Sequence, residues 1–361
     1  MSGLLVLVTG TGRSGTSTIS GSLHHLGLHV PGPYLGANKT NPKGFYESRW
    51  AVDFHKELTG RALIDAFDGQ PDAMERARSA AGPDMRSALA DWLRVQADGH
   101  TQVVVKDPRS VWAQGLWRDA AHEAELDIAY VSMLRHPAEV IGSRATYYAS
   151  KADEAQRRRY EVCSVGRWVN GSLISERETR GQRRTFVPYT DLLDDWRTVL
   201  RRVRDDLGLE LNTDLSQNSH HPVDDFIDPN LRRIRVTWEE LIVPPDLRGI
   251  AQSVWDELSG LYGLGADDEG TSSRLDELSG RYETLYADAA AIALDAAATQ
   301  VKEARLRVER ELRDQRPRKD DAAERKPAHE PSSEERRIRD ASGRELLRAV
   351  GRRLVTRIRK R

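Results

Sequence analysis

The sequence predicts an α/β fold in three layers, with a central, mostly parallel sheet between helices and a helical extension at the C-terminus. Three observations support this prediction. Short apolar stretches typical of buried strands alternate with longer stretches that carry helical spacing. A glycine-rich turn follows the first strand. Beyond about residue 265 the composition changes to Ala, Arg, Glu and Asp, as in charged helices.

Composition and charge exclude several classes of protein. The chain has 361 residues and a formal net charge of −1, so its overall charge gives no reason to expect a nucleic-acid partner. Cys163 is the single cysteine, so no intrachain disulfide can form. The apolar start lacks a preceding basic segment, and no stretch approaches the ~20 apolar residues that span a bilayer. We therefore expect a cytoplasmic protein.

The first strand and the loop after it predict a phosphate-binding site. The run 4–8 is apolar and β-branched, and Gly10 and Gly15 match the G-x-x-x-x-G spacing of a P-loop. A helix that begins at Thr16 would point its positive end at the same hollow. Thr16 stands where nucleotide kinases have lysine, and the positive charge is at Arg13 instead. We expect a P-loop-like anion site, although an ordinary glycine-rich turn also fits this stretch alone.

Glu47 is a candidate general base. The stretch 31–43 is rich in Pro, Gly and Asn and predicts a loop beside the phosphate site, and Glu47 opens a predicted helix at 48–58. A carboxylate there either gains from the helix dipole or takes a proton from a substrate at the mouth of the site. Residues 72–96 predict a surface helix.

Two further strands end in charged residues. The strand predicted at 102–105 is followed by Lys106, Asp107 and Arg109, and ligands of parallel sheets bind beyond the carboxyl ends of strands. Surface ion pairing with Asp107 is the alternative. The strand at 127–134 is followed by Arg135, and Ser143 lies two helical turns later, so both are expected to meet on one anion. A helix at 157–179, a strand at 184–189 and a helix at 191–207 complete the alternation.

Together these strand ends resemble the sulfotransferase family that uses 3′-phosphoadenosine 5′-phosphosulfate (PAPS), in its bacterial and carbohydrate-acting branch, over about residues 1–263. The segment RSGTS resembles the family's 5′-phosphosulfate loop, which assigns PAPS binding to Arg13, Ser14, Gly15, Thr16 and Ser17. The segment Arg135 to Ser143 resembles its 3′-phosphate motif.

The resemblance implies further site residues. VVVKDPR is similar to the family's KDPR strand end, the segment that begins at Tyr189 to one near the adenine, and FIDPNLRR to a late basic loop that contains Arg232 and Arg233. The aryl and steroid branch has a histidine general base where this chain has Pro108. Other branches use a glutamate after the first helix, so the resemblance favours Glu47, with Asp107 as the alternative base.

The implied reaction moves a sulfuryl group from PAPS to a hydroxyl acceptor, a glycan or glycolipid, without a metal. Arg13 and Lys106 would supply positive charge, and Glu47 would take the acceptor's proton. A P-loop kinase acting on ATP is one alternative, but the loop lysine and an acidic magnesium ligand are not evident. A non-catalytic, membrane-associated nucleotide-binding scaffold is another.

The predicted organisation is a catalytic domain at 1–265, a helical extension at 266–313, a charged flexible linker at 314–340 and a basic amphipathic helix at 341–361. The extension carries an apolar repeat with heptad spacing, which predicts a solitary helix or a dimeric coiled coil, and hence a homodimer. The repeat contains Leu275, Leu278, Tyr282, Leu285, Ala289, Ile292 and Ala296. The segment 341–361 carries a net charge of +7, which predicts binding to an anionic membrane surface or to a protein. The enzyme would then be peripheral at the inner face of the membrane.

Overall fold

The computed structural model describes residues 3–38, 41, 43–148, 153–217, 219–228, 236–264 and 267–314. The chain divides into two compact units, Met1–Leu285 and Tyr286–Arg361. The first unit therefore continues past the predicted domain end at 265. Arg232, Arg233, the linker beyond residue 314 and the basic segment 341–361 lie outside the described residues.

The first unit contains a sheet of four parallel strands, which confirms the predicted α/β class. The strands lie in the order β2-β1-β3-β4. Each is a short, largely buried run, and β1, β2 and β3 are rich in Val, Leu and Ile, as expected for strands covered on both faces. Their bounds are Gly3–Thr9 (β1), Gln102–Lys106 (β2), Leu126–Leu134 (β3) and Arg184–Pro188 (β4).

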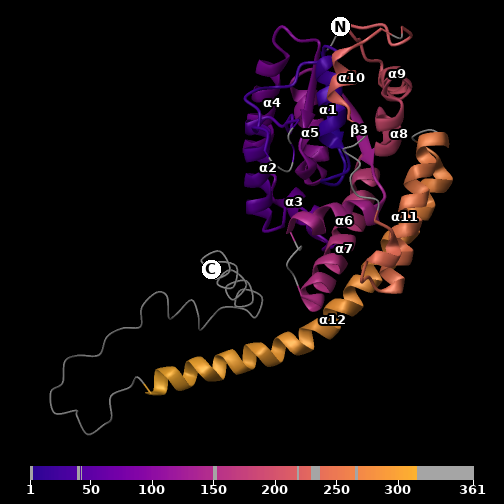
Figure 1. Ribbon diagram of the computed structural model, residues 1–361. Helices are drawn as coiled ribbons and strands as arrows, with labels where there is room; N and C mark the ends of the chain where they lie inside the picture. The colour runs from indigo at the N-terminus through magenta and orange to yellow at the C-terminus, as the bar shows by residue number, and fades with distance from the viewer. Residues whose placement is uncertain are drawn as a thin grey trace, which may run out of the picture. The chain divides into compact units, whose positions relative to one another are not determined.

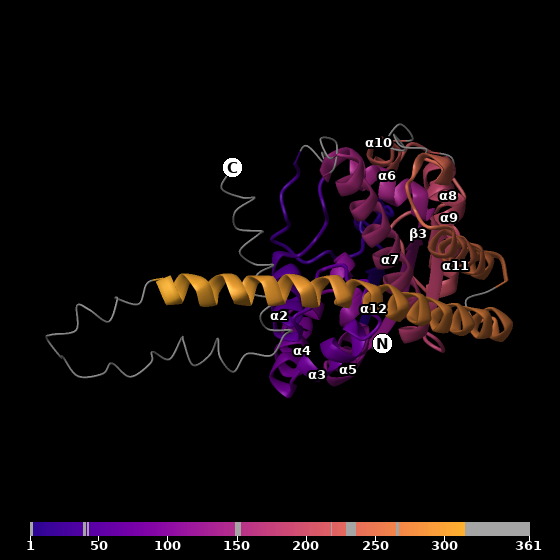
Figure 2. The ribbon, with the colours of Figure 1, turned by 90° about the horizontal axis from the view of Figure 1, so that it is seen from below.

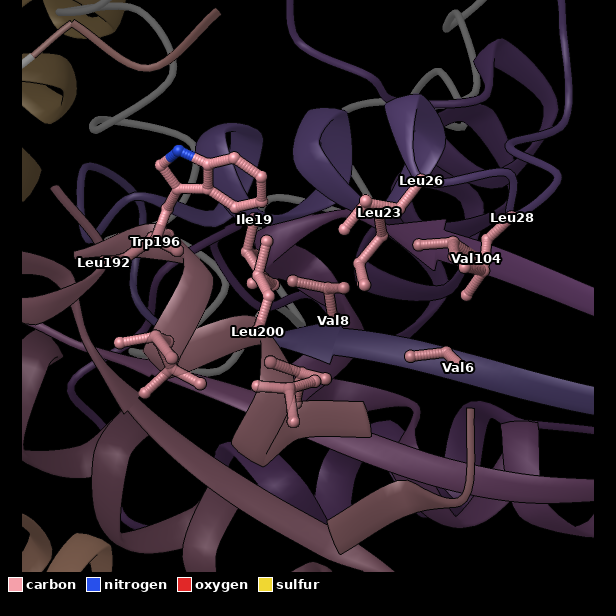
Figure 3. Close-up of a cluster of buried hydrophobic side chains, with 14 of the residues drawn as sticks. Val6, Val8, Ile19, Leu23, Leu26, Leu28, Val104, Leu192, Trp196 and Leu200 are labelled. Atoms are coloured by element: carbon pink, nitrogen blue, oxygen red, sulfur yellow. The ribbon is translucent and has the colours of Figure 1, made fainter. Parts of the chain in front are cut away.

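Helices cover both faces of the sheet, so the predicted three layers are present (Figure 1). Side chains alternate along β1: Val6 and Val8 face one cluster, and Leu5 and Leu7 face the other. Figure 3 shows the first cluster, in which Val8 packs beneath Ile19 and Leu23 of α1. The helices of this face are α1 (Thr16–His25), α8 (Tyr189–Asp194), α9 (Trp196–Leu207) and α10 (Pro222–Phe226).

The opposite face is covered by α2 (Arg49–Ala62), α4 (Pro83–Ala97) and α5 (Gln114–Glu123), with α3 (Ala73–Ala80) beside them. The prediction of one helix over 72–96 was wrong in its continuity. Ala81 and Gly82 are extended, and Pro83 occupies the first turn of α4, where its missing N–H costs nothing. The predicted helix at 191–207 is also two helices, because Asp195 leaves the helical conformation and its side chain accepts a hydrogen bond from the Thr198 N–H at 3.1 Å.

The order of the strands places the carboxyl end of β1 at a switch in topology. From β1 the chain goes to β2 on one side, and then crosses to β3 on the other side of β1. In open parallel sheets the crevice for ligands lies at such a point. The loop that joins β1 to α1 occupies this position.

The remaining helices are α6 (Pro137–Tyr148), α7 (Glu154–Glu178) and α11 (Pro245–Leu264), with short 3₁₀ turns at Pro108–Trp112 (η1) and Trp238–Glu240 (η3). Of these, α11 packs against the edge strand β4 and against α7, which also contacts α6. None of the helices in the described ranges combines the length and apolar character that crossing a bilayer requires.

The helical extension is one helix, α12 (Glu269–Asp314), coloured orange to yellow in Figures 1 and 2. Its first turns belong to the first unit. Leu275, Leu278 and Tyr282 are buried, and the Tyr282 hydroxyl donates a hydrogen bond to the Gly69 carbonyl at 2.6 Å. Farther along, Ile292 is 78% exposed. The first three positions of the predicted heptad repeat therefore pack within the chain, and a dimeric coiled coil remains a prediction.

Candidate active site

The loop after β1 has a conformation that only a few residues can adopt. Gly10, Arg13 and Gly15 have positive φ angles of 127°, 77° and 93°. A Cβ atom on Gly15 would lie 2.2 Å from the ring of Tyr189, so glycine is required there for both reasons. Because Gly15 has no side chain, α1 begins without a side-chain cap. The first N–H groups of α1 thus favour an anion beside this loop.

Arg13, Arg135 and Ser143 meet on one side of the loop, although they come from three segments. The Arg13 Nε donates to the Ser143 Oγ at 3.2 Å, and an Arg135 Nη donates to the Arg13 carbonyl at 3.0 Å. The Arg135 Nε also donates to the Glu139 carboxylate at 3.0 Å, and its guanidinium lies 4.9 Å from the centre of the Tyr189 ring. Burial raises the pKa of Tyr189, so its hydroxyl stays protonated.

Lys106 and Glu47 form a buried ion pair on the other side of the loop. The Lys106 Nζ lies 2.5 Å from the Glu47 Oε1, and the exposed fractions of the two residues are only 2% and 6%. Lys106 also donates to the Ser17 Oγ at 3.0 Å, so these contacts use two of its three ammonium hydrogens. Asn41 donates to the same hydroxyl at 3.2 Å. Lys106 therefore pairs with Glu47, not with Asp107.

Asp107 is fully buried, and both of its oxygens accept hydrogen bonds. The Oδ2 faces the His55 Nδ1 at 2.9 Å, and the Oδ1 accepts from the Arg109 N–H at 3.0 Å and from its guanidinium at 2.8 Å. Burial alone would raise the pKa of Asp107, but the hydrogen bond from His55 and the charge and backbone N–H of Arg109 hold the pKa below its ordinary value. A fully engaged carboxylate fits a general base less well than Glu47 does.

Three partners of the site were missed by the sequence analysis. Glu139 carried a signal, because a carboxylate four residues after Arg135 at the start of a helix is placed to pair with it. Asn41 and His55 carried none, since their partners Ser17 and Asp107 are distant in the sequence.

The chemistry of these groups suits a ligand with more than one anionic group. Three cations, two hydroxyls and the N-terminus of α1 surround the loop, and a carboxylate lies beside them. Among the described residues there is no cluster of His, Cys, Asp and Glu that would hold a metal ion.

A cavity lies beside the loop that follows β1. Gly10, Thr11 and Arg135 line it together with aromatic side chains that include Trp112 and Trp168. Neither Glu47 nor Lys106 is among its lining residues, so the cavity lies beside the ion pair and not at it.

The family model described as "Sulfotransferase family" matches residues 6–213. The chain is similar in structure to the sulfotransferase domain of the olefin synthase of Synechococcus PCC 7002, with 16% identity, a TM-score of 0.40, and coverage of 72% of this chain and 95% of that one. It is also similar to the sulfotransferase domain of the curacin biosynthetic pathway, with 16% identity, a TM-score of 0.37, and coverage of 72% of this chain and 98% of that one.

A third similar structure is a sulfotransferase from Mycobacterium tuberculosis H37Rv, with 16% identity, a TM-score of 0.35, and coverage of 64% of this chain and 76% of that one. No curated protein sequence matches the chain. The family match spans more than half of the chain and contains the loop, Glu47, Lys106, Arg135, Ser143 and Tyr189. The chain therefore belongs to the sulfotransferase family.

Proposed function

We propose that this sulfotransferase takes the sulfuryl group of PAPS and transfers it to a hydroxyl of a carbohydrate or glycolipid. The observation that carries this proposal is the convergence of three strand ends on one loop, with cations on both sides of it. PAPS has anionic groups at two positions, a 5′-phosphosulfate and a 3′-phosphate. Two separate cationic clusters are the arrangement that such a donor needs.

The two clusters suggest an orientation for the donor. The loop, Lys106 and Ser17 would hold the phosphosulfate at the start of α1. Arg135 and Ser143 would hold the 3′-phosphate, Arg13 would reach from the loop toward the phosphosulfate, and Tyr189 would lie near the adenine. Arg232 and Arg233, named by the family resemblance alone, are proposed to add to the same nucleotide site.

In the proposed reaction the acceptor hydroxyl attacks sulfur in line with the bond that breaks. A new O–S bond forms, the bond from sulfur to the bridging phosphate oxygen breaks, and the hydroxyl proton passes to the Glu47 carboxylate. Negative charge that builds on the leaving phosphate oxygen is balanced by Lys106, Arg13 and the loop N–H groups. Adenosine 3′,5′-bisphosphate leaves, and Glu47 returns its proton to solvent.

The first prediction concerns the nucleotide. We expect adenosine 3′,5′-bisphosphate to bind far more tightly than ATP, because Arg135 and Ser143 are placed for a 3′-phosphate that ATP lacks. Arg135→Ala should cost about 2–5 kcal/mol of that binding, the scale for removing a charged partner of a buried anion. Arg94→Ala, which removes a surface arginine paired with Asp91, is the matched control and should bind as the unchanged protein does. Isothermal titration calorimetry measures the affinity of the unchanged protein for both nucleotides and of the two variants for the bisphosphate.

Equal affinity of the unchanged protein for ATP and for the bisphosphate would overturn the donor assignment. The acceptor is tested by transfer of labelled sulfate from PAPS to purified glycans, glycolipids and cell-envelope extracts. Label in a protein or a small phenol, and none in glycans or glycolipids, would contradict the proposed acceptor class while leaving the donor in place.

A further inference from the structure

His55 lies in the middle of α2, fully buried, and forms hydrogen bonds through both ring nitrogens. Its Nδ1 is 2.9 Å from the Asp107 Oδ2, and its Nε2 is 2.8 Å from the indole nitrogen of Trp117. Asp107 and Trp117 are as completely buried as His55 is. A histidine without access to solvent cannot exchange protons with a substrate, so this chain of three residues is not itself a proton relay.

The identity of the partners fixes the form of the imidazole. An indole N–H can only donate, so the Nε2 of His55 must accept and carries no hydrogen. The single hydrogen of the neutral ring is then on Nδ1 and is donated to Asp107. A hydrogen on Nε2 would place two donors against each other, so the hydrogen bond from Trp117 requires a bare Nε2.

Two contacts join α2 and the segment just before it to the end of β2, at the consecutive residues Lys106 and Asp107. Glu47, just before α2, pairs with Lys106, and His55, two turns into the helix, binds Asp107. The second oxygen of Asp107 in turn holds Arg109 at the start of η1. The position of Lys106 relative to Glu47 therefore depends on a carboxylate that His55 orients.

We propose that His55 is a positioning residue for sulfuryl transfer: through Asp107 it holds the end of β2 against α2, so that Lys106 and Glu47 keep the separation the reaction needs. Trp117 holds the ring in the tautomer that donates to Asp107 from Nδ1. The inference rests on the proposed function, because it assigns His55 an effect on that reaction. It needs no contact between His55 and either substrate.

The first experiment follows the imidazole nitrogens of His55 by long-range ¹⁵N–¹H NMR at pH 7, with His55→Asn used for assignment. In the unchanged protein we expect the hydrogen on Nδ1 and a bare Nε2. Trp117→Phe keeps an aromatic ring but removes the indole N–H, so the tautomer with its hydrogen on Nε2 should become populated. The charged groups that face the ring are Asp107 and, behind it, Arg109. The control is Trp92→Phe, since Trp92 lies in the same aromatic cluster, with ring centres 6.1 Å from Trp117, and should leave His55 unchanged.

The second experiment separates positioning from packing. His55→Asn retains an N–H donor for Asp107 and should keep kcat within a few-fold. His55→Leu donates nothing and should lower kcat by about 10²-fold, the loss expected when a group is misplaced by about 1 Å. The KM for PAPS should change little in either variant. The ¹³Cε resonance of Lys106 should shift in the leucine variant and not in the asparagine variant. Equal kcat and equal Lys106 shifts in both would overturn the proposal, as would an unchanged protein in which the Nε2 of His55 carries the hydrogen.

These readouts distinguish the two ways of failing. If the protein transfers no sulfate, the proposed function fails, and the Lys106 resonance still decides whether His55 positions the ion pair. If transfer occurs but the resonance does not distinguish the two variants, the proposed function stands and the role of His55 is overturned.

Discussion

The ion pair between Glu47 and Lys106 is hard to explain by stability alone. Removing two charges from water costs several kcal/mol for each, and their attraction in the interior often only offsets that cost. Apolar residues of similar size would hold α2 to β2 equally well. The pair also lies beside the loop proposed to bind the phosphosulfate, where charge is useful to a reaction and not only to folding.

Replacing the carboxylate of Glu47 tests its role directly. Glu47→Gln should keep the affinity for adenosine 3′,5′-bisphosphate but lower turnover by roughly 10²- to 10⁴-fold, because the amide still accepts a hydrogen bond from Lys106 but cannot take a proton. Arg13→Ala should lower both the affinity for the bisphosphate and the turnover. Initial rates with PAPS and calorimetry with the bisphosphate separate these outcomes.

Glu57→Gln provides the matched control, since Glu57 lies on the same helix and pairs with Arg61 at the surface. Its rate should equal that of the unchanged protein. Near-full activity of Glu47→Gln would instead move the general base to Asp107, despite the hydrogen bonds that occupy both of its oxygens.

Asp107 should also make stability depend on pH. Its folded-state pKa lies below the ordinary value of 3.8, so its contribution is complete above that value and is lost as the pH falls through the lower folded pKa. Asp107→Asn should destabilise the protein by about 3–5 kcal/mol at pH 7, the cost of removing one partner of a buried pair. The difference from the unchanged protein should shrink below about pH 4. Urea denaturation at pH 7, 5 and 3.5 measures it, and a difference that does not change with pH would rule out this linkage.

At the scale of elements, the sequence predicts strands and their ends well, because a buried parallel strand is a compact apolar run that needs no partner to be identified. The strands found at Gln102–Lys106 and Leu126–Leu134 differ from the predicted bounds by one residue. The contacts between elements are not written locally. Lys106 meets Glu47 across 59 positions, and Trp117 meets His55 across 62, so these pairs follow only from the packing of α2 against β2 and α5.

The break between α3 and α4 is a different kind of error. Gly82 and Pro83 are a recognisable start signal for a helix, but the apolar spacing of 72–96 continues across them. The apolar periodicity therefore predicts one helix where the structure has two. Both helices still bury their apolar sides, with Met74 and Ala77 on α3 and Leu89 and Leu93 on α4.

The first turns of α12 should be part of the stable core, and the rest of the helix should not. Leu275 is 1% exposed and Ile292 is 78% exposed, and both belong to the same apolar repeat. We expect Leu275→Ala to cost about 2–5 kcal/mol, the usual range for a buried leucine, and Ile292→Ala to change stability by less than about 0.5 kcal/mol. Urea denaturation of the two variants gives the comparison. A large effect of Ile292→Ala that grows with protein concentration would instead indicate the dimeric coiled coil.

At the scale of the whole molecule, the small net charge conceals a strong separation of negative and positive charge along the chain. The chain carries −1 in total, and residues 341–361 carry +7, which leaves −8 for residues 1–340. The same segment has apolar residues at helical spacing, at Leu346, Leu347, Val350, Leu354, Val355 and Ile358. An acidic enzyme with a basic, amphipathic end is suited to an anionic surface, because the end is attracted while the remainder is repelled.

We therefore expect the full chain to bind vesicles of anionic lipid reversibly through residues 341–361. Each Lys or Arg near such a surface contributes about 1 kcal/mol at low salt, and the apolar side of the helix can enter the headgroup region. In sedimentation assays the full chain should pellet with anionic vesicles and a chain ending at Arg316 should not, and high salt should weaken the binding because the charges are screened.

Neutral vesicles and a variant with Arg352, Arg353 and Arg357 changed to Gln are the controls. A truncated chain that pellets as well as the full one would exclude this segment as the anchor, and a basic end that captures a protein partner but no vesicle would favour protein docking. Either result leaves sulfuryl transfer untouched, because none of the residues proposed for it lies beyond Arg233.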